Sequence, residues 1–171
     1  QLFLCNRTLE AEWFYDEAFW DEYLTRLAYA RYNNLSLTLA HQIAYLAPPY
    51  PFLVDVPGFP QVRARDFSDA ERDRHLEMFQ RIAAMTRQRG LHFTFGVWSQ
   101  HAHRYGESLV EGLTDDILSS YNAAGLATVL AACPQIDGVQ FRMNVESGVD
   151  EEHQAEFYEP QFRAVAECGR P

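Results

Sequence analysis

The most reactive candidate in the sequence is Glu146, which lies just after a predicted strand over residues 136–143. Alternation along this strand places Gln140, Arg142 and Asn144 on one side. A carboxyl group beside an arginine and an amide is a general acid if burial favours its protonated form, or a ligand-binding carboxylate if Arg142 favours the charged form. The structural alternative is a carboxylate that only stabilises the start of the next helix.

Polar side chains also follow the other predicted strands. Because the carboxyl ends of parallel strands share one rim, we expect these side chains to converge on a binding pocket. The predicted substrate-binding residues are His41, Gln42, Tyr45, Trp98, Gln100, His101, Arg142 and Asn144. Strict alternation from Leu35 would turn His41 toward the helices, so its place in the pocket requires a bulge at the end of its strand.

His101 and His103 have a spacing that resembles a metal site. No further His, Asp or Glu follows at suitable intervals nearby, so the sequence favours solvated loop histidines over a metal centre. We expect neither a metal nor another cofactor. The dispersed cysteines Cys5, Cys133 and Cys168 indicate buried or half-buried thiols rather than a redox or zinc site.

Strands and helices alternate along the chain in the order β-α-β-α-β-α-β-α. The capping box from Ser68 to Glu71 and the helix-ending Gly90 make the second helix the most secure element, and Asn33-Asn34 is expected to break the first. Asp16 is the expected N-cap of that first helix. The predicted strands cover residues 2–5, 35–40, 91–98 and 136–143, and the helices cover residues 16–32, 68–89, 114–132 and 151–167.

The connections from strand to helix are long and polar, whereas those from helix to strand are short. This asymmetry is typical of an α/β fold of the (β/α)8 TIM-barrel type, here a partial barrel of about four βα units with parallel strands. A small open sheet is the alternative, and a Rossmann fold is disfavoured because no G-x-G-x-x-G motif follows a strand. Residues 1–171 form one predicted domain. Its open sheet edges suggest strands 1 to 4 of a larger barrel, or less readily two associating halves.

The composition excludes some classes of partner. A formal net charge of −10 without any run of Lys or Arg argues against nucleic-acid binding. The apolar runs are strand-sized, so no membrane span is expected, and no signal peptide is visible.

The segments Glu-Trp-Phe-Tyr-Asp-Glu-Ala-Phe-Trp (12–20), Arg-Tyr-Asn-Asn-Leu (31–35) and Gln-Phe-Arg-Met-Asn-Val-Glu-Ser-Gly (140–148) together resemble the catalytic barrel of α-glucuronidase-like glycoside hydrolases. The resemblance implies a carbohydrate substrate, including glycosides of uronic acids. It implies that Glu146 matches the acid that protonates the glycosidic oxygen after strand four. It further implies a sugar subsite lined by His41, Trp98, Gln100, Arg142 and Asn144.

One departure from this family bears on activity. Glycoside hydrolysis ordinarily needs a second carboxylate, which in such barrels comes from later strands that this sequence does not contain. We therefore expect the remaining half of the barrel to be a partner and the isolated fragment to be inactive. The alternatives are a non-catalytic carbohydrate-binding barrel and, less favoured, metal-dependent sugar chemistry at His41 and His101.

The segment 44–59 is rich in proline and aromatic residues. We expect Tyr45, Tyr50 and Phe52 to form a stacking wall for a sugar ring, with Asp55 accepting hydrogen bonds from its hydroxyl groups. A rigid lid that only covers the pocket is the alternative, and the two roles are compatible.

Overall fold

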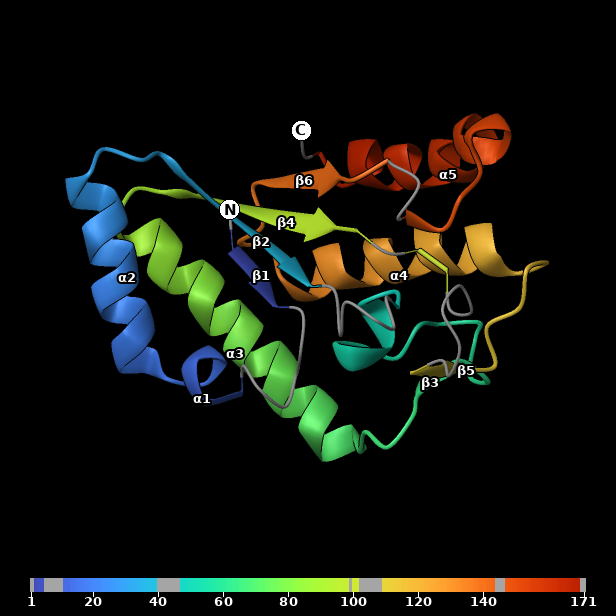
Figure 1. Ribbon diagram of the computed structural model, residues 1–171, viewed down its shortest axis with the longest axis horizontal. Helices are drawn as coiled ribbons and strands as arrows, with labels where there is room; N and C mark the ends of the chain where they lie inside the picture. Colours follow the sequence, from blue (N-terminus) through green and yellow to red (C-terminus); the bar gives the residue numbers. More distant parts are fainter. Residues whose placement is uncertain are drawn as a thin grey trace.

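The computed structural model describes residues 2–4, 11–39, 47–98, 100–101, 109–143 and 147–169. Helices and strands alternate along it, with two short 3-10 turns (Figure 1). The elements are β1 (Leu2–Leu4), α1 (Ala11–Phe14), α2 (Glu17–Tyr29), β2 (Asn34–Leu39), η2 (Tyr50–Phe52), β3 (Arg63–Ala64), α3 (Asp69–Gln88), β4 (His92–Val97), β5 (Val110–Glu111), α4 (Leu118–Ala132), β6 (Gly138–Phe141), η4 (Glu151–His153) and α5 (Gln154–Glu167).

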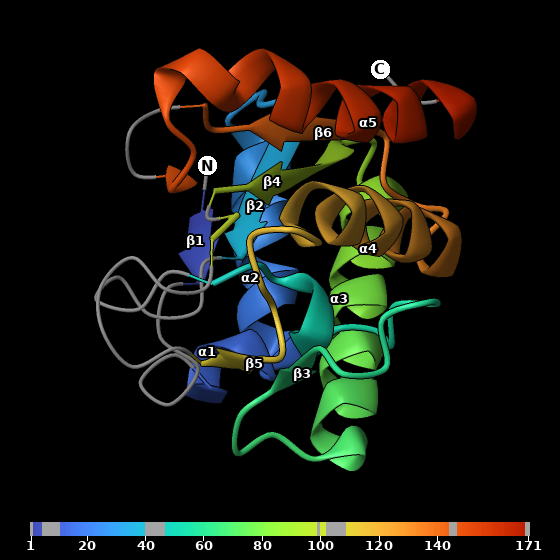
Figure 2. The same cartoon turned by 90° about the vertical axis from the view of Figure 1, so that its right-hand side faces the viewer.

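Four parallel strands form the main sheet in the order β1-β2-β4-β6, which is their order along the chain. Each neighbouring pair is joined through a helix, and α3, α4 and α5 lie along the sheet (Figures 1 and 2). A strand order that never reverses has no switch point, which separates this sheet from doubly wound folds. The prediction of a partial (β/α)8 barrel with parallel strands is confirmed.

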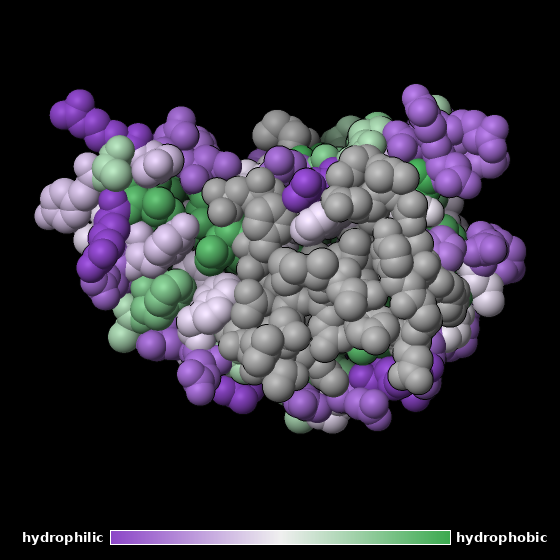
Figure 3. All heavy atoms as spheres, viewed as in Figure 1, coloured by the Kyte–Doolittle hydropathy of each residue, from purple (hydrophilic) through white to green (hydrophobic). Residues whose placement is uncertain are grey.

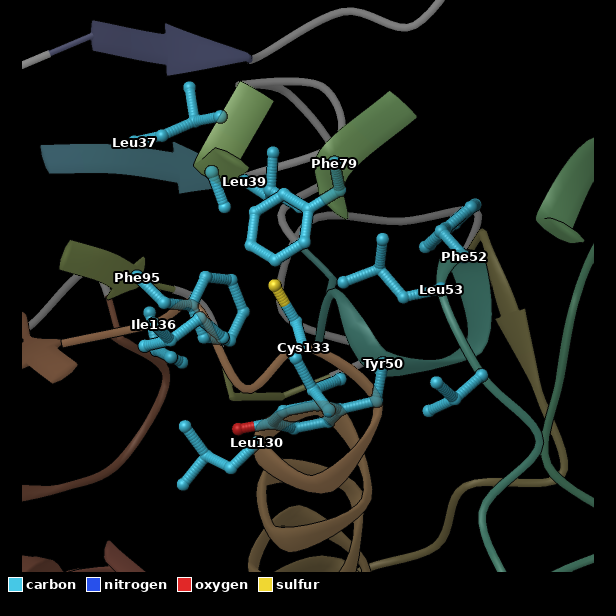
Figure 4. Close-up of a cluster of buried hydrophobic side chains, with 14 of the residues drawn as sticks. Leu37, Leu39, Tyr50, Phe52, Leu53, Phe79, Phe95, Leu130, Cys133 and Ile136 are labelled. Atoms are coloured by element: carbon cyan, nitrogen blue, oxygen red, sulfur yellow. The ribbon is translucent and has the colours of Figure 1, made fainter. Parts of the chain in front are cut away.

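The core fills the space between this sheet and its helices. Leu37 of β2 and Phe95 of β4 are paired in register and are fully buried. The ring of Phe79 on α3 lies 5.4 Å from that of Phe95, and Cys133 at the end of α4 packs beside them (Figure 4). The apolar residues of alternate strand positions therefore face the helices, as period-two alternation predicts.

The opposite face of the sheet is polar. Ser36 Oγ of β2 donates a hydrogen bond of 2.7 Å to Gln140 Oε1 of β6, across the intervening β4. Gly96 of β4 makes this crowding possible, since a Cβ there would lie 2.1 Å from the Oγ1 atom of Thr38. Val139 packs against the core on the helix side, so the predicted division of β6 into two faces is confirmed.

Several local predictions hold at the helix ends. Asp16 Oδ1 accepts hydrogen bonds from the backbone N–H groups of Ala18 and Phe19 at 2.9 and 3.2 Å. Ser68 and Glu71 form the predicted capping box, and Gly90 has a φ of 72°. The helix α3 is therefore bounded by its own sequence signals.

The predicted break at Asn33-Asn34 is wrong. The first long helix ends at Tyr29, and Arg31 adopts the left-handed conformation with a φ of 62°. The N–H of Tyr32 donates to the carbonyl of Leu27 at 3.1 Å and that of Arg31 to Ala28 at 3.0 Å. These two bonds form a Schellman motif, which sets the left-handed position by geometry whichever residue occupies it.

No helix of the described residues is long and apolar enough to cross a membrane. Hydrophilic residues cover the outer parts of the face seen in Figure 3. The sequence carries a net charge of −10.

Candidate functional site

The loops that follow β4 and β6 are joined at the carboxyl end of the sheet. The backbone N–H of Gln100 donates to the carbonyl oxygen of Ser147 at 3.0 Å, and that of Arg142 donates to Val97 at 3.0 Å. Gly148, with a φ of 86°, packs so closely on His101 that an added Cβ would lie 2.5 Å from the His101 Cβ. Arg142 and Ser147 therefore both lie at this rim.

The predicted catalytic residue, Glu146, and the predicted ligand Asn144 lie outside the described residues, as do His41, Gln42 and Tyr45. Their roles stay predictions. Of the predicted site residues, the structure describes Trp98, Gln100, His101 and Arg142.

Arg142 and Trp98 meet at the rim. The guanidinium carbon of Arg142 lies 4.1 Å from the centre of the Trp98 ring system, and both residues are half-buried. This is a cation–π contact, which places a fixed positive charge and a flat ring side by side. Two residues predicted from different strands are thus brought together.

Gln100 lies deeper than a rim residue. Its side chain is fully buried, and among the described residues neither polar atom of its amide group has a hydrogen-bond partner. Its backbone is held on two sides, because Asn122 Nδ2 of α4 donates to the Gln100 carbonyl at 3.2 Å. A buried amide without partners is costly, which is typical of positions that serve a ligand or a neighbouring group. Its predicted contact with substrate is untested.

Asn122 was missed in the sequence. It is fully buried on α4, where it also donates to the carbonyl of Leu118 at 2.8 Å. The signal was present, since a lone amide among the apolar residues of a helix usually has a structural partner. Nothing in the sequence pattern identified Gln100 as that partner.

His101 contacts the exposed side chain of Asp115, and its Nε2 atom lies 3.2 Å from the carboxylate oxygen Oδ1. Within the described ranges, no group of three or more His, Cys, Asp or Glu side chains is arranged to hold a metal ion. His103, the other half of the predicted pair, lies outside those ranges.

The predicted stacking wall is wrong for Tyr50 and Phe52, which are both fully buried. The 3-10 turn η2 directs Tyr50 onto α4, where its ring lies over the helix near Leu130 and Cys133 (Figure 4). A Cβ on Gly125 would lie only 2.5 Å from the Tyr50 Cγ, so the glycine makes room for this ring. The segment serves as part of the core, because burying two large aromatic side chains outweighs leaving them exposed for a ligand.

Three tyrosines with raised pKa values lie beneath the rim. Burial raises the pKa of Tyr50 well above its ordinary value, with smaller contributions from Tyr121 and Tyr158. Burial also raises the pKa of Tyr121, with a further contribution from the charge of Asp55. Burial likewise raises the pKa of Tyr158. All three therefore remain uncharged at neutral pH.

No protein-family model matches the sequence, and no curated protein matches it. Solved structures share its fold, among them the following two. A GH138 enzyme targeting pectin rhamnogalacturonan II matches 96% of this chain and 19% of its own, at 20% identity and a TM-score of 0.69. A GH5_18 enzyme from Streptomyces cattleya, in complex with Manβ1-4GlcNAc, matches 99% of this chain and 42% of its own, at 17% identity and a TM-score of 0.58.

Both of these structural neighbours are glycoside hydrolases, so the fold of this chain is the one used by such enzymes. At these identities the similarity shows the fold alone. The chain spans less than half the length of either neighbour. Neither is described as an α-glucuronidase, and that narrower resemblance stays a prediction.

Proposed function

We propose that this chain is half of the catalytic barrel of a glycoside hydrolase, with Glu146 as its general acid. The observation that carries the proposal is the hydrogen bond between the Gln100 N–H and the Ser147 carbonyl. It holds the residue after Glu146 against the end of the neighbouring strand, at the rim that carries Trp98 and Arg142. Active sites of (β/α)8 enzymes lie at this end of the strands.

The proposed substrate is a glycoside, with uronic-acid-containing glycosides as the narrower class. Arg142 supports this class, because a guanidinium group binds carboxylates through paired N–H donors. The guanidinium carbon lies over the Trp98 ring at 4.1 Å, and this cation–π contact holds the positive charge of Arg142 at the rim. His41, Gln42, Tyr45, Gln100, His101 and Asn144 complete the proposed substrate-binding set.

The second carboxylate is proposed to come from the remaining half of the barrel. The described side chains on the polar face of the sheet, which include Ser36, Thr38 and Gln140, carry no carboxyl group. A pair of carboxyl groups across the scissile bond is the ordinary requirement of glycoside hydrolysis. The isolated chain is therefore proposed to bind its ligand without turning it over.

The test compares Glu146→Gln with the wild-type protein in the form that contains the complete barrel. Loss of a general acid is expected to lower kcat for alkyl glycosides by about 10²–10⁴-fold. Dinitrophenyl glycosides should be affected much less in their bond-breaking step, because their leaving group departs without a proton. Glu151→Gln, an exposed carboxylate five positions further along, is the matched control. Unchanged turnover of alkyl glycosides by Glu146→Gln would refute the assignment.

The second candidate is a non-catalytic carbohydrate-binding barrel. The absence of carboxyl groups from the described polar face of the sheet favours it. In that case ligand binding would persist in the complete protein without any turnover, and Arg142→Gln would weaken binding while Glu146→Gln would reveal no acid-dependent step.

A further inference from the structure

An open cavity of about 910 Å³ lies between β2 and α3 along the chain, and its lining does not include the rim residues Trp98 and Arg142. It is lined by residues 51–72, including the first turn of α3. This segment connects the carboxyl end of β2 to the start of α3 and includes β3, so the residues that line the cavity follow the same end of the sheet as the rim (Figures 1 and 2). Its volume lies in the upper part of the range of ligand-binding pockets.

An ionic clamp forms the polar side of this cavity. Arg72 Nη1 donates to Asp55 Oδ1 at 2.7 Å and to Asp69 Oδ1 at 3.0 Å. The Arg72 side chain is only 15% exposed, whereas the Asp55 and Asp69 side chains are 84% and 89% exposed. The guanidinium group thus fixes two carboxylates whose remaining lone pairs face solvent, and each carboxylate can accept several more hydrogen bonds.

Half-buried rings form the apolar side. Phe59 packs edge-on against Tyr121 with 5.5 Å between ring centres, and Phe67 packs edge-on against Phe52 at 5.3 Å. Both rings also line the cavity, together with Pro57 and Pro60. Each ring therefore contacts a buried ring, so little side-chain entropy is lost when a ligand packs on it.

The backbone around the cavity is braced. β3 pairs with β5 in a short antiparallel ribbon, and Arg65 bonds Glu111 across it at 3.1 Å. Gly112, with a φ of 75°, lies so close to the Gln61 carbonyl that an added Cβ would be 2.1 Å from that oxygen. A side chain at position 112 would push the β3–β5 ribbon away from Gln61. The wall of the cavity therefore depends on glycine at this position.

We propose that this cavity is a second carbohydrate subsite, which binds a neutral portion of an oligosaccharide through Asp55, Asp69, Phe59 and Phe67. Fixed carboxylates accept hydrogen bonds from sugar hydroxyl groups, and the rings cover the apolar face of a sugar. The lining charges balance, with Asp55 and Asp69 against Arg63 and Arg72, so the cavity offers no net attraction to an anionic sugar. The carbohydrate class of the ligand rests on the proposed function.

An extended peptide is the competing ligand. It would bind by adding a strand to the β3–β5 ribbon, yet each of those strands has only two residues. A ribbon of that length offers few backbone groups for pairing, so the cavity suits hydroxyl-rich rings better.

The test is backbone-amide NMR titration of this chain with xylohexaose, mannohexaose, hexagalacturonate and a threonine–valine hexapeptide. At least one neutral hexaose is expected to shift amides within residues 54–69, and Asp55→Asn should weaken that binding about tenfold or more. Asp73→Asn is the matched control, because Asp73 contacts the same Arg72 at 3.5 Å but does not line the cavity. Its affinity should equal that of the wild type.

Three results would overturn the subsite: no shifts within residues 54–69 with either neutral hexaose, an equal loss of affinity in Asp73→Asn, or saturation of the cavity by the peptide instead. The outcome is independent of Glu146. If Glu146→Gln loses turnover but no neutral hexaose binds at residues 54–69, only the subsite is refuted. If a neutral hexaose binds there but Glu146→Gln keeps its turnover, only the proposed acid is refuted.

Discussion

The Gln100 N–H and the Ser147 carbonyl are 3.0 Å apart, which joins the loops after two neighbouring parallel strands. Asn122 supports the same junction from α4 through its bond to the Gln100 carbonyl. Two hydrogen bonds therefore link a buried amide on a helix, that of Asn122, to Ser147, the residue that directly follows the proposed acid.

Asn122→Ala is expected to lower the free energy of unfolding by about 1–3 kcal/mol. The substitution removes the side-chain N–H group that donates to the buried carbonyl of Gln100. Urea denaturation monitored by circular dichroism measures the change. Ser120→Ala on the same helix is the control, since its exposed hydroxyl donates only to Ile117 within its own turn. Equal losses in the two variants would contradict the junction.

Gly125→Ala is expected to destabilise the protein by about 1–3 kcal/mol through overpacking. In an unobstructed helix the same change would stabilise by about 1 kcal/mol, so the sign of the effect is diagnostic. The cause is the contact with Tyr50, whose Cγ would lie 2.5 Å from the new methyl group. In a Tyr50→Leu background the penalty should shrink, and a stabilising Gly125→Ala would show that this packing is wrong.

Arg142→Gln is expected to change the fluorescence of Trp98, because it removes the charge that lies 4.1 Å from its ring. The contact itself should contribute about 0.5–2 kcal/mol. The emission spectra of the variant and the wild type are compared, then compared again in a Trp98→Phe background, where the difference should vanish. Arg163→Gln, which removes an exposed guanidinium paired with Glu159, should leave the spectrum unchanged.

The buried tyrosines predict a loss of stability at alkaline pH. Burial raises the pKa values of Tyr50, Tyr121 and Tyr158 in the folded state, whereas unfolded tyrosine titrates near a pKa of about 10. Below that pH neither state ionises, so their contribution is fully present. Above it the unfolded chain loses protons that the folded protein retains, and stability falls by up to about 1.4 kcal/mol per pH unit for each tyrosine.

Urea denaturation between about pH 9 and pH 11 measures this slope. Tyr121→Phe should make it shallower. Tyr29→Phe, at a side chain that is 86% exposed, should not change it. A slope that is identical in all three proteins would mean that buried tyrosines do not control alkaline stability.

The periodicity of the sequence determined the parallel sheet and its alternation with helices. It also determined which side chains of β6 share a face of the sheet. These features depend on local rules: Ser68 and Glu71 cap their helix within one turn, and Val139 and Gln140 alternate because side chains on a strand do so. The same rules identified Trp98 and Arg142 as neighbours at the rim, since parallel strands end together.

Tertiary packing alone decided which aromatic residues are exposed and which amide supports the site. The sequence predicted that Tyr50 belongs to a stacking wall or a lid, whereas the space above Gly125, far along the chain, places it in the core. Asn122 of α4 and Gln100 after β4 are partners across distant parts of the chain, and the cavity beside Arg72 is lined by both β3 and the first turn of α3. Contacts between distant segments depend on side-chain packing that becomes complementary only after folding. The spacing of residues along the sequence therefore does not predict these contacts.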